Sequence, residues 1–542
     1  MRRTERGELR PRRTITAIIL TASAALALAQ APPGPDGFPL TIESLRDELE
    51  NFAYELAEAY YALDAYGEEV DTGPIYEKYA FLDDPVLVDW LRSLEKDGRL
   101  DSRSCRLLAR DLEGNLLWFP IEEFYYDYLS TEASGVIEVG GDEFMYRELD
   151  DIIFREDGRE MRRELWEAKR GFIVGELNPR LAEIVEAMRR ESRRLGYADF
   201  ADFYARTHGR DFGRLAADCI YLLGATRGMY ETLATERVRA VFPDLALEEV
   251  RSYDRGQLWR TDGYDRYFTA ERLIPLMLEF TEGLGIDFTA LGNVSLDAEN
   301  RPEKEPRAAC WPMRVPEDIR VLVKPTGGFT DYETLFHELG HALHFAYTDP
   351  ELPYEFRLLG DDAVTETYAF TLENVFENPL FLELAVGMTD EEEMRRFRRE
   401  QLFAEVSSLR GYCTSFLYEM VLHGVEADPL ESYVELVDWA GVWSRTAQEY
   451  DTGVYLTNED FYTTNYLYAW MLEAVIRREL VRRFGDDWWR EPAAGDFFQG
   501  LWSRGYLLTP EEIAVELGHA ELSPVPLLER LLAEDEATRP GD

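Results

Sequence analysis

The chain has 542 residues, a formal net charge of −48 and a pI near 4.5. A surface this acidic repels nucleic acid and anionic membranes, which excludes both as principal partners. The hydrophobic content of 46% allows a large core, and the length suggests one large domain or two lobes. The cysteines are far apart, so we expect no disulfide framework, although one bridge stays possible, and none has a neighbourhood typical of a metal site: Cys105, Cys219, Cys310 and Cys413.

The N-terminus has the pattern of a secretory signal peptide. Six arginines precede an apolar run at 15–28, and small residues suited to cleavage surround Ala29. We therefore expect a signal peptide at 1–29, a breaker-rich linker at 30–40, and export to the periplasm or the extracellular space without membrane insertion. The alternative is an uncleaved membrane anchor.

Helical periodicity dominates the chain from Thr41 onwards. An apolar stripe runs from Ile42 to Leu56, and further helices are predicted over 181–195, opened by Asn178 and Pro179, and over 215–238. These patterns predict a mainly α fold. We expect an N-terminal helical lobe at 41–205, a catalytic lobe at 206–530 and a flexible tail at 531–542.

One segment, 319–324 (IRVLVK), reads as a β-strand because β-branched residues fill it and prolines and glycines bound it. It predicts a small sheet directly before the helix described next. An edge strand in this place could pair with an extended peptide. An ordinary strand within a small sheet fits the sequence equally well.

The sequence TDYETLFHELGHALHF at 330–345 predicts a helix that carries an H-E-x-x-H motif. His337 and His341 are four residues apart, so both imidazoles project from one face and can share a metal ion. Glu338 lies beside them, where a carboxylate can take a proton from water. This is the arrangement of zinc peptidases. A second E-L-G-H at 516–519 has Val515 in place of the first histidine, so it should have no such chemistry.

A third ligand is expected downstream. Residues 360–366 (GDDAVTE) predict a helix cap and a new helix, with Glu366 near its start and Glu373 two turns later on the same face. We interpret Glu366 as the third metal ligand and Glu373 as a residue that orients a histidine ligand. A solvated acidic face is the alternative. His344 lies about one turn beyond His341 and could also support the ligands.

These residues resemble the M3 family of zinc oligopeptidases, the thimet oligopeptidase and oligoendopeptidase F group. The resemblance rests on FHELGHALH at 336–344, on the 29-residue spacing between His337 and Glu366, on Glu373, on 310–333 and on LGYADFADFYA at 195–205. It implies one Zn²⁺ per chain, bound by His337, His341 and Glu366, with Glu338 as general base. It also implies two helical lobes around a deep channel. The angiotensin-converting-enzyme-like M2 peptidases share much of this pattern.

An aromatic stretch at 460–470 (DFYTTNYLYAW) is similar to the segment that closes on substrate in oligoendopeptidase F. By this resemblance Tyr468 is the favoured hydrogen-bond donor to the oxyanion, and Tyr462 and Tyr466 are candidate substrate contacts. Aromatic core packing is the alternative for each. The family usually has a histidine near the start of the stretch, where this chain has Asp460, and a tyrosine where it has Asn465.

The sequence thus predicts an exported zinc metallopeptidase that cleaves internal bonds of short peptides. Two alternatives stay open. One is a dipeptidyl carboxypeptidase of the M2 type, which would need a cationic group for the substrate carboxylate. The other is an inactive zinc-bearing protein that binds peptides.

Overall fold

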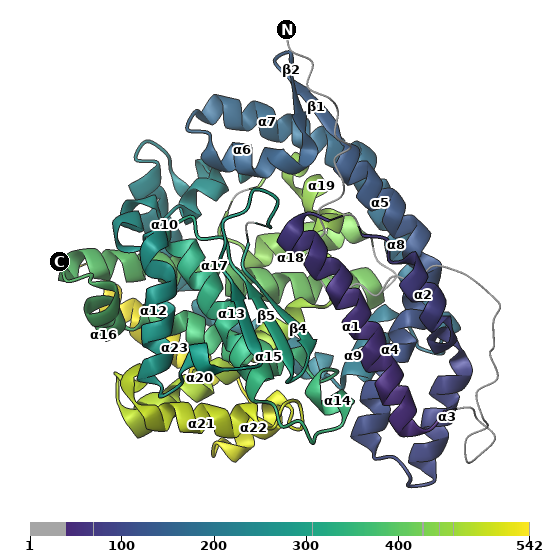
Figure 1. The fold of residues 1–542 in the computed structure, drawn as a ribbon. Coiled ribbons are helices and arrows are strands. Elements are labelled where there is room, and N and C mark those ends of the chain that lie inside the picture. The colour runs from purple at the N-terminus through teal and green to yellow at the C-terminus, as the bar shows by residue number, and fades with distance from the viewer. Residues whose placement is uncertain are drawn as a thin grey trace. The chain divides into compact units, whose positions relative to one another are not determined.

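The computed structural model describes residues 40–68, 70–305, 307–424, 428–443, 445–458 and 460–540, so the predicted signal peptide lies outside the described residues. The fold is mainly α, as predicted (Figure 1). The described chain divides into two compact units, one formed by 113–260 and 406–463, the other by the rest. Each unit therefore consists of separated segments of the chain, whereas the predicted lobes at 41–205 and 206–530 are continuous. Among the described helices, none is long and apolar enough to cross a bilayer.

The unit that includes the H-E-x-x-H motif contains a small sheet enclosed by helices. Its elements are α1 (Ile42–Tyr66), α2 (Gly73–Tyr79), α3 (Pro85–Lys96), most of α4 (Ser102–Trp118), α12 (Ala270–Gly283), β3 (Val294–Asp297), β4 (Ala309–Arg314), β5 (Asp318–Leu322), α13 (Phe329–Tyr347), α14 (Tyr354–Arg357), α15 (Asp362–Glu373), α16 (Pro379–Phe381), the start of α17 (Glu391–Gly424), most of α20 (Thr463–Phe484), α21 (Pro492–Trp502), α22 (Pro510–Glu516) and α23 (Val525–Thr538).

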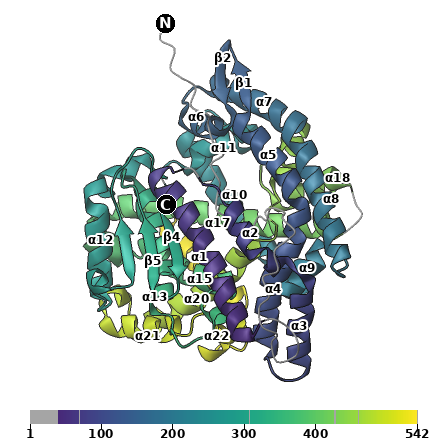
Figure 2. The ribbon, with the colours of Figure 1, turned by 45° about the vertical axis from the view of Figure 1, so that its right-hand side comes forward.

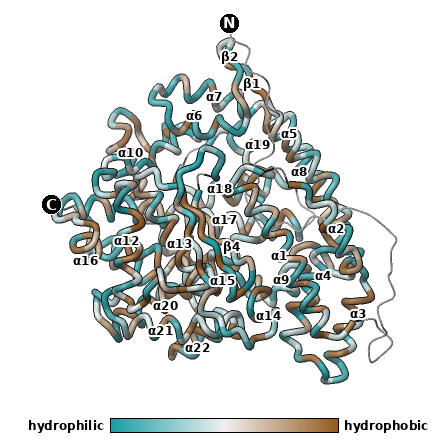
Figure 3. The backbone as a smooth tube through the Cα atoms, in the orientation of Figure 1, coloured by the Kyte–Doolittle hydropathy of each residue, from teal (hydrophilic) through white to brown (hydrophobic). Residues whose placement is uncertain are grey.

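The sheet has the strand order β3-β5-β4, with β5 parallel to β3 and antiparallel to β4. The predicted strand at 319–324 is β5, which is central, so it cannot be the edge strand that the sequence left open. The edge beside the motif is β4. Helix α1 packs on one face of β4, where the rings of Tyr61 and Trp311 meet edge to face at 6.2 Å. Helix α13 packs against β4 and β5 as well (Figure 2). Figure 3 shows hydrophobic segments gathered along these strands and α13.

Helices α13 and α15 pack closely, and a glycine inside the motif allows it. A Cβ atom added to Gly340 would lie 2.5 Å from Cα of Ala369 and from the carbonyl oxygen of Tyr368, so any side chain there would push the helices apart. Helix α15 begins at Asp362, and Asp361 caps it by accepting from the N–H of Ala363, as the sequence predicted. This close packing brings the acids of α15 to the histidines of α13.

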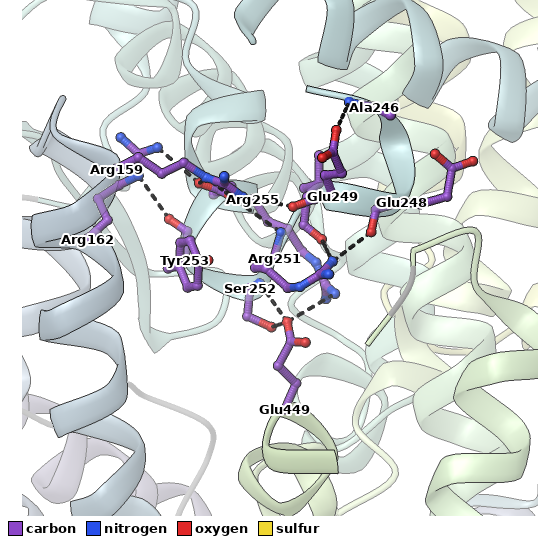
Figure 4. A network of polar contacts seen from close by, with 12 residues as sticks. Arg159, Arg162, Ala246, Glu248, Glu249, Arg251, Ser252, Tyr253, Arg255 and Glu449 are labelled. Carbon is purple, nitrogen blue, oxygen red and sulfur yellow. Dashed lines mark hydrogen bonds and ion pairs between the residues drawn. The ribbon is translucent and has the colours of Figure 1, made fainter. Parts of the chain in front are cut away.

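The other unit is built from helices with one small hairpin. Its elements are the end of α4, α5 (Glu122–Ser134), β1 (Val136–Val139), β2 (Asp142–Met145), α6 (Leu149–Arg155), α7 (Arg159–Phe172), α8 (Asn178–Arg194), α9 (Phe200–His208), α10 (Phe212–Val241), α11 (Ser252–Arg255), the end of α17, α18 (Pro429–Ala440) and α19 (Ala447–Leu456). A network of polar contacts joins α7, α11 and α19, centred on two arginines and the buried Asp254 (Figure 4).

Two boundaries differ from the sequence prediction. Helix α23 runs to Thr538, with Leu531 fully buried and Asp535 3% exposed in an ion pair with Arg399, so residues 531–538 of the predicted tail are an ordered helix. The run looked like a tail because acidic residues dominate it, and its arginine partners are distant in the sequence. Helix α13 begins at Phe329, one residue earlier than predicted, with Gly328 as its N-cap.

Candidate metal centre and catalytic site

Three predicted ligands meet at one point between α13 and α15. Nε2 of His337 lies 3.2 Å from Nε2 of His341. Oε2 of Glu366 lies 3.4 Å from the first nitrogen and 3.7 Å from the second. Among the described residues, this is the one group of three or more His, Cys, Asp or Glu side chains whose ligand atoms are close enough to hold an ion together.

The triangle of ligand atoms fits a zinc ion. Zinc–nitrogen and zinc–oxygen bonds of about 2.0–2.1 Å with tetrahedral angles place neighbouring ligand atoms roughly 3.3 Å apart. The three observed separations lie on both sides of that value. Two imidazole nitrogens and one carboxylate oxygen are also a donor set found in catalytic zinc sites, where the fourth position stays available for water or substrate.

The other nitrogen of each imidazole is held by a residue of α15. Nδ1 of His337 lies 2.8 Å from Oε2 of Glu373, and Nδ1 of His341 lies 2.8 Å from Oγ1 of Thr365. These hydrogen bonds direct both Nε2 atoms toward Glu366. Hydrogen-bonded partners of this kind fix the orientation of a histidine ligand and raise its basicity. Glu373, for which the sequence predicts a role in orienting a histidine ligand, contacts His337, and the contact of Thr365 with His341 was not foreseen.

Glu338, the predicted base, reaches the edge of the sheet. Its Oε2 accepts a hydrogen bond of 2.6 Å from the backbone N–H of Cys310 in β4. Burial raises the pKa of the Glu338 carboxyl to about 7, which suits a group that takes up and releases a proton near neutral pH. The sequence gives Cys310 no neighbourhood typical of a metal site, yet the fold places its backbone beside the proposed base. The contact is made by the backbone of residue 310 and not by its thiol, so the identity of this residue in the sequence gave no indication of the contact.

The charge around the site favours a cation. Burial lowers the pKa of His341 to about 4, so this imidazole is neutral and available as a ligand at pH 7. Burial, together with the charge of Glu373, raises the pKa of Glu333 to about 8, and burial also raises the pKa of Glu373. Buried acids whose pKa is raised in part by neighbouring carboxylates lie in a negative potential, which a metal ion would relieve.

His344 does not face the ligand atoms. It is fully buried, with its Nε2 3.4 Å from the carbonyl oxygen of Gly505 and its ring against Tyr368 and Tyr506. Burial lowers its pKa to about 3, which keeps it neutral. Its position indicates a packing role and not support of the metal ligands.

The three predicted tyrosines occupy different surroundings. The ring of Tyr466 packs on Phe370 at 5.8 Å, and Phe370 in turn packs on the imidazole of His337 at 5.2 Å. Tyr468 is 5% exposed and lies two residues further along α20, roughly 200° around the helix from Tyr466. Tyr462 precedes α20 and belongs to the other unit. Their roles toward a substrate stay predictions.

The segment before α20, where the sequence resemblance leads one to expect a histidine, has Asp460 in a left-handed backbone conformation. Asp460 and Phe461 both have positive φ, 54° and 66°, which is uncommon for residues other than glycine. Asp460 accepts from the side-chain amide of Asn458, and the N–H of Phe461 donates to the buried Glu419. The Phe461 ring, fully buried, packs on Phe200 and Phe212. These contacts hold the left-handed backbone in place.

Comparison with known proteins gives a fold-level match. No family model and no curated protein matches the chain. Among solved structures, the chain is similar to the crystal structure of a "putative oligoendopeptidase F" from Bacillus anthracis str. Ames, with a TM-score of 0.62 and 16% sequence identity. The match covers 92% of this chain and 90% of the other. The chain therefore has the fold of this oligoendopeptidase F-like structure over nearly its whole length.

Proposed function

We propose that the protein is a zinc-dependent metallopeptidase that hydrolyses internal bonds of short peptides. The observation that carries this proposal is the triangle formed by Nε2 of His337, Nε2 of His341 and Oε2 of Glu366, with the carboxylate of Glu338 on the adjacent residue. The fold match to an oligoendopeptidase-like structure supports the same conclusion. His337, His341 and Glu366 would hold the ion, and Glu373 and Thr365 would orient the imidazoles.

Zinc bound there would supply Lewis acidity, which lowers the pKa of water and polarises a carbonyl group. Glu338 acts as the general base: its carboxylate takes a proton from the attacking water and then delivers it to the leaving amine. The pKa of about 7 allows both transfers near neutral pH. Tyr468 is proposed to donate a hydrogen bond to the oxyanion, and Tyr462 and Tyr466 to contact the substrate.

The remaining features of the proposal follow from the sequence. The N-terminal pattern supports export, so the substrates would be peptides of the periplasm or the extracellular space. The charge of −48 favours neutral or cationic peptides over anionic ones.

The test is hydrolysis of a library of quenched fluorescent peptides by purified protein, with and without a chelator, and with mass spectrometry of the products. We expect cleavage at internal bonds that stops on chelation and returns with Zn²⁺. Release of C-terminal dipeptides alone would favour the dipeptidyl carboxypeptidase. Binding of peptides without cleavage by the zinc-loaded protein would favour the inactive peptide-binding protein.

A further inference from the structure

The edge of the sheet touches the proposed base through one backbone group. The N–H of Cys310 donates to Oε2 of Glu338 in a short hydrogen bond of 2.6 Å. Residues 310 and 338 belong to different elements, β4 and α13, so the bond ties the base to the sheet.

The register of the sheet explains why this N–H is available. In an antiparallel pair, the N–H groups of alternate residues point toward the partner strand and away from it. Cys310 lies opposite Val321, and its N–H points away from β5 toward Glu338. The next residue with the same direction is Pro312, which has no N–H. Along this edge, Cys310 is therefore the position where β4 offers a donor near the base.

We propose that the backbone N–H of Cys310 is a positioning group for the general base, an inference that rests on the proposed peptidase function. By holding Oε2 of Glu338, it fixes the carboxylate plane and leaves Oε1 to face the attacking water. A glutamate side chain has three rotatable bonds, and an anchored oxygen removes most of that freedom before substrate arrives. The side chain of Cys310 plays no part in this.

Two variants at one position isolate the N–H. Cys310→Ala keeps the amide and sets the reference, and Cys310→Pro removes the N–H at a place where no ladder hydrogen bond is lost. We expect kcat of the proline variant to be about 10- to 100-fold below that of the alanine variant, with KM nearly unchanged and zinc still bound. If the proline variant does not fold, lactic acid introduced at 310 by nonsense suppression replaces only the N–H by an ester oxygen.

A second measurement is independent of turnover. The chain has four cysteines, so labelling with 15N-cysteine gives at most four backbone amide signals, and the signal that Cys310→Ala removes is that of Cys310. We expect this amide proton to resonate downfield, and to move upfield in Glu338→Ala because its charged acceptor is lost. The matched control is Glu333→Ala, five residues earlier on α13, which should leave the signal in place.

Equal kcat in the alanine variant and in the variant without the N–H would overturn the proposal. A rise in KM with kcat unchanged would also overturn it, because the N–H would then bind substrate and not the base. A Cys310 amide that does not move in Glu338→Ala overturns it even if no peptide is hydrolysed. Failure of the wild-type protein to hydrolyse any peptide counts against the proposed function alone.

Discussion

Two clusters of buried charged residues, one in each unit, differ in whether their charged groups find partners within the cluster. In the first, the fully buried Asp254 accepts hydrogen bonds from Arg159, from Arg162 and from the backbone N–H of Arg251 (Figure 4). Arg162, only 1% exposed, gives its other N–H groups to the backbone carbonyls of Glu156, Asp157 and Tyr253. The carboxylate of Asp254 and the guanidinium of Arg162 therefore have their hydrogen-bond partners within this cluster.

In the second cluster, between α13 and α15, the charged groups do not all find partners within the cluster. Burial raises the pKa of Glu333 and of Glu373 and lowers that of His341, whereas Glu366 and Glu373 raise the pKa of His337 against the effect of burial. Two imidazole nitrogens lie 3.2 Å apart, facing each other. The difference teaches that burial of charge is not in itself a mark of function. Buried charges whose partners lie within the cluster fit a structural role, whereas perturbed groups around a place that could hold a cation mark a candidate functional site.

The largest effect should come from removing a ligand of the cluster between α13 and α15. His341→Ala is expected to lose stoichiometric zinc and all measurable hydrolysis, because two donors cannot hold the ion as three do. The melting temperature of the metal-free protein should change little. Zinc content is measured by atomic emission after dialysis. The control is His519→Ala, in the second E-L-G-H, which should keep full zinc, and zinc retained by His341→Ala would contradict the assignment.

Glu338→Gln separates binding from chemistry. The amide keeps the size of the side chain and can still accept from Cys310, but it cannot take a proton, so zinc should stay while kcat falls by about 10²–10⁴. Since the base must be ionised and burial raises its pKa to about 7, wild-type kcat/KM should decline as pH drops below about 7. A variant that keeps wild-type turnover would mean that another group removes the proton.

A substitution in the Asp254 cluster should lower the stability of the fold and leave zinc binding unchanged. Asp254→Asn leaves the buried Arg162 and the partly exposed Arg159 without their counter-charge, which we expect to cost about 3–5 kcal/mol in the free energy of unfolding. Zinc affinity and activity per folded molecule should not change. Urea denaturation measures the first quantity. The control is Asp157→Asn, whose carboxyl is 93% exposed beside Arg260 and should matter by at most about 0.5 kcal/mol.

The features of the fold and of the site that the sequence predicts are those that depend on residues close together in the chain. The H-E-x-x-H helix, Glu366 at the start of its own capped helix and Glu373 two turns later all follow from spacing on single helices, and the structure brings these residues together. A helix cap within 360–366, which the structure places at Asp361, and the mainly α fold were predicted by the same local rules.

Contacts that depend on tertiary packing were missed. Nothing in the sequence pairs Thr365 with His341, because the contact depends on the closeness of α13 and α15 at Gly340. The contact of Cys310 with Glu338 needs the strand order β3-β5-β4, which the sequence could not give. The same strand order places β5 in the centre. The sequence predicted a flexible tail at the acidic end of α23, because the arginine that pairs with Asp535, Arg399, lies on another helix far away in the sequence.

The aromatic stretch offers a smaller effect. Tyr468→Phe removes one hydroxyl and keeps the ring, so we expect kcat to fall by about 10²–10³ with KM, zinc content and melting temperature nearly unchanged. Tyr466→Phe, whose ring packs on Phe370 beside His337, is the matched comparison and should do less. If Tyr466→Phe gave the larger loss, the oxyanion donor would lie on the face of α20 that meets α15. Full activity in both variants would make the two tyrosines packing residues.

The smallest effects should come from the residues that orient the ligands. Thr365→Val keeps the shape of the side chain but removes the hydroxyl at Nδ1 of His341, and Glu373→Gln removes the charge at Nδ1 of His337. Each change should weaken zinc binding by about 10- to 100-fold, measured by competition with a chelator, and hardly alter the stability of the metal-free protein. Ser252→Ala, the equivalent loss of one hydroxyl in the Asp254 network, removes a donor to Glu449 and should cost about 1 kcal/mol with no change in zinc affinity. If Thr365→Val instead lowered stability and left zinc affinity unchanged, the α13–α15 cluster would resemble the Asp254 network, and its histidines would be structural.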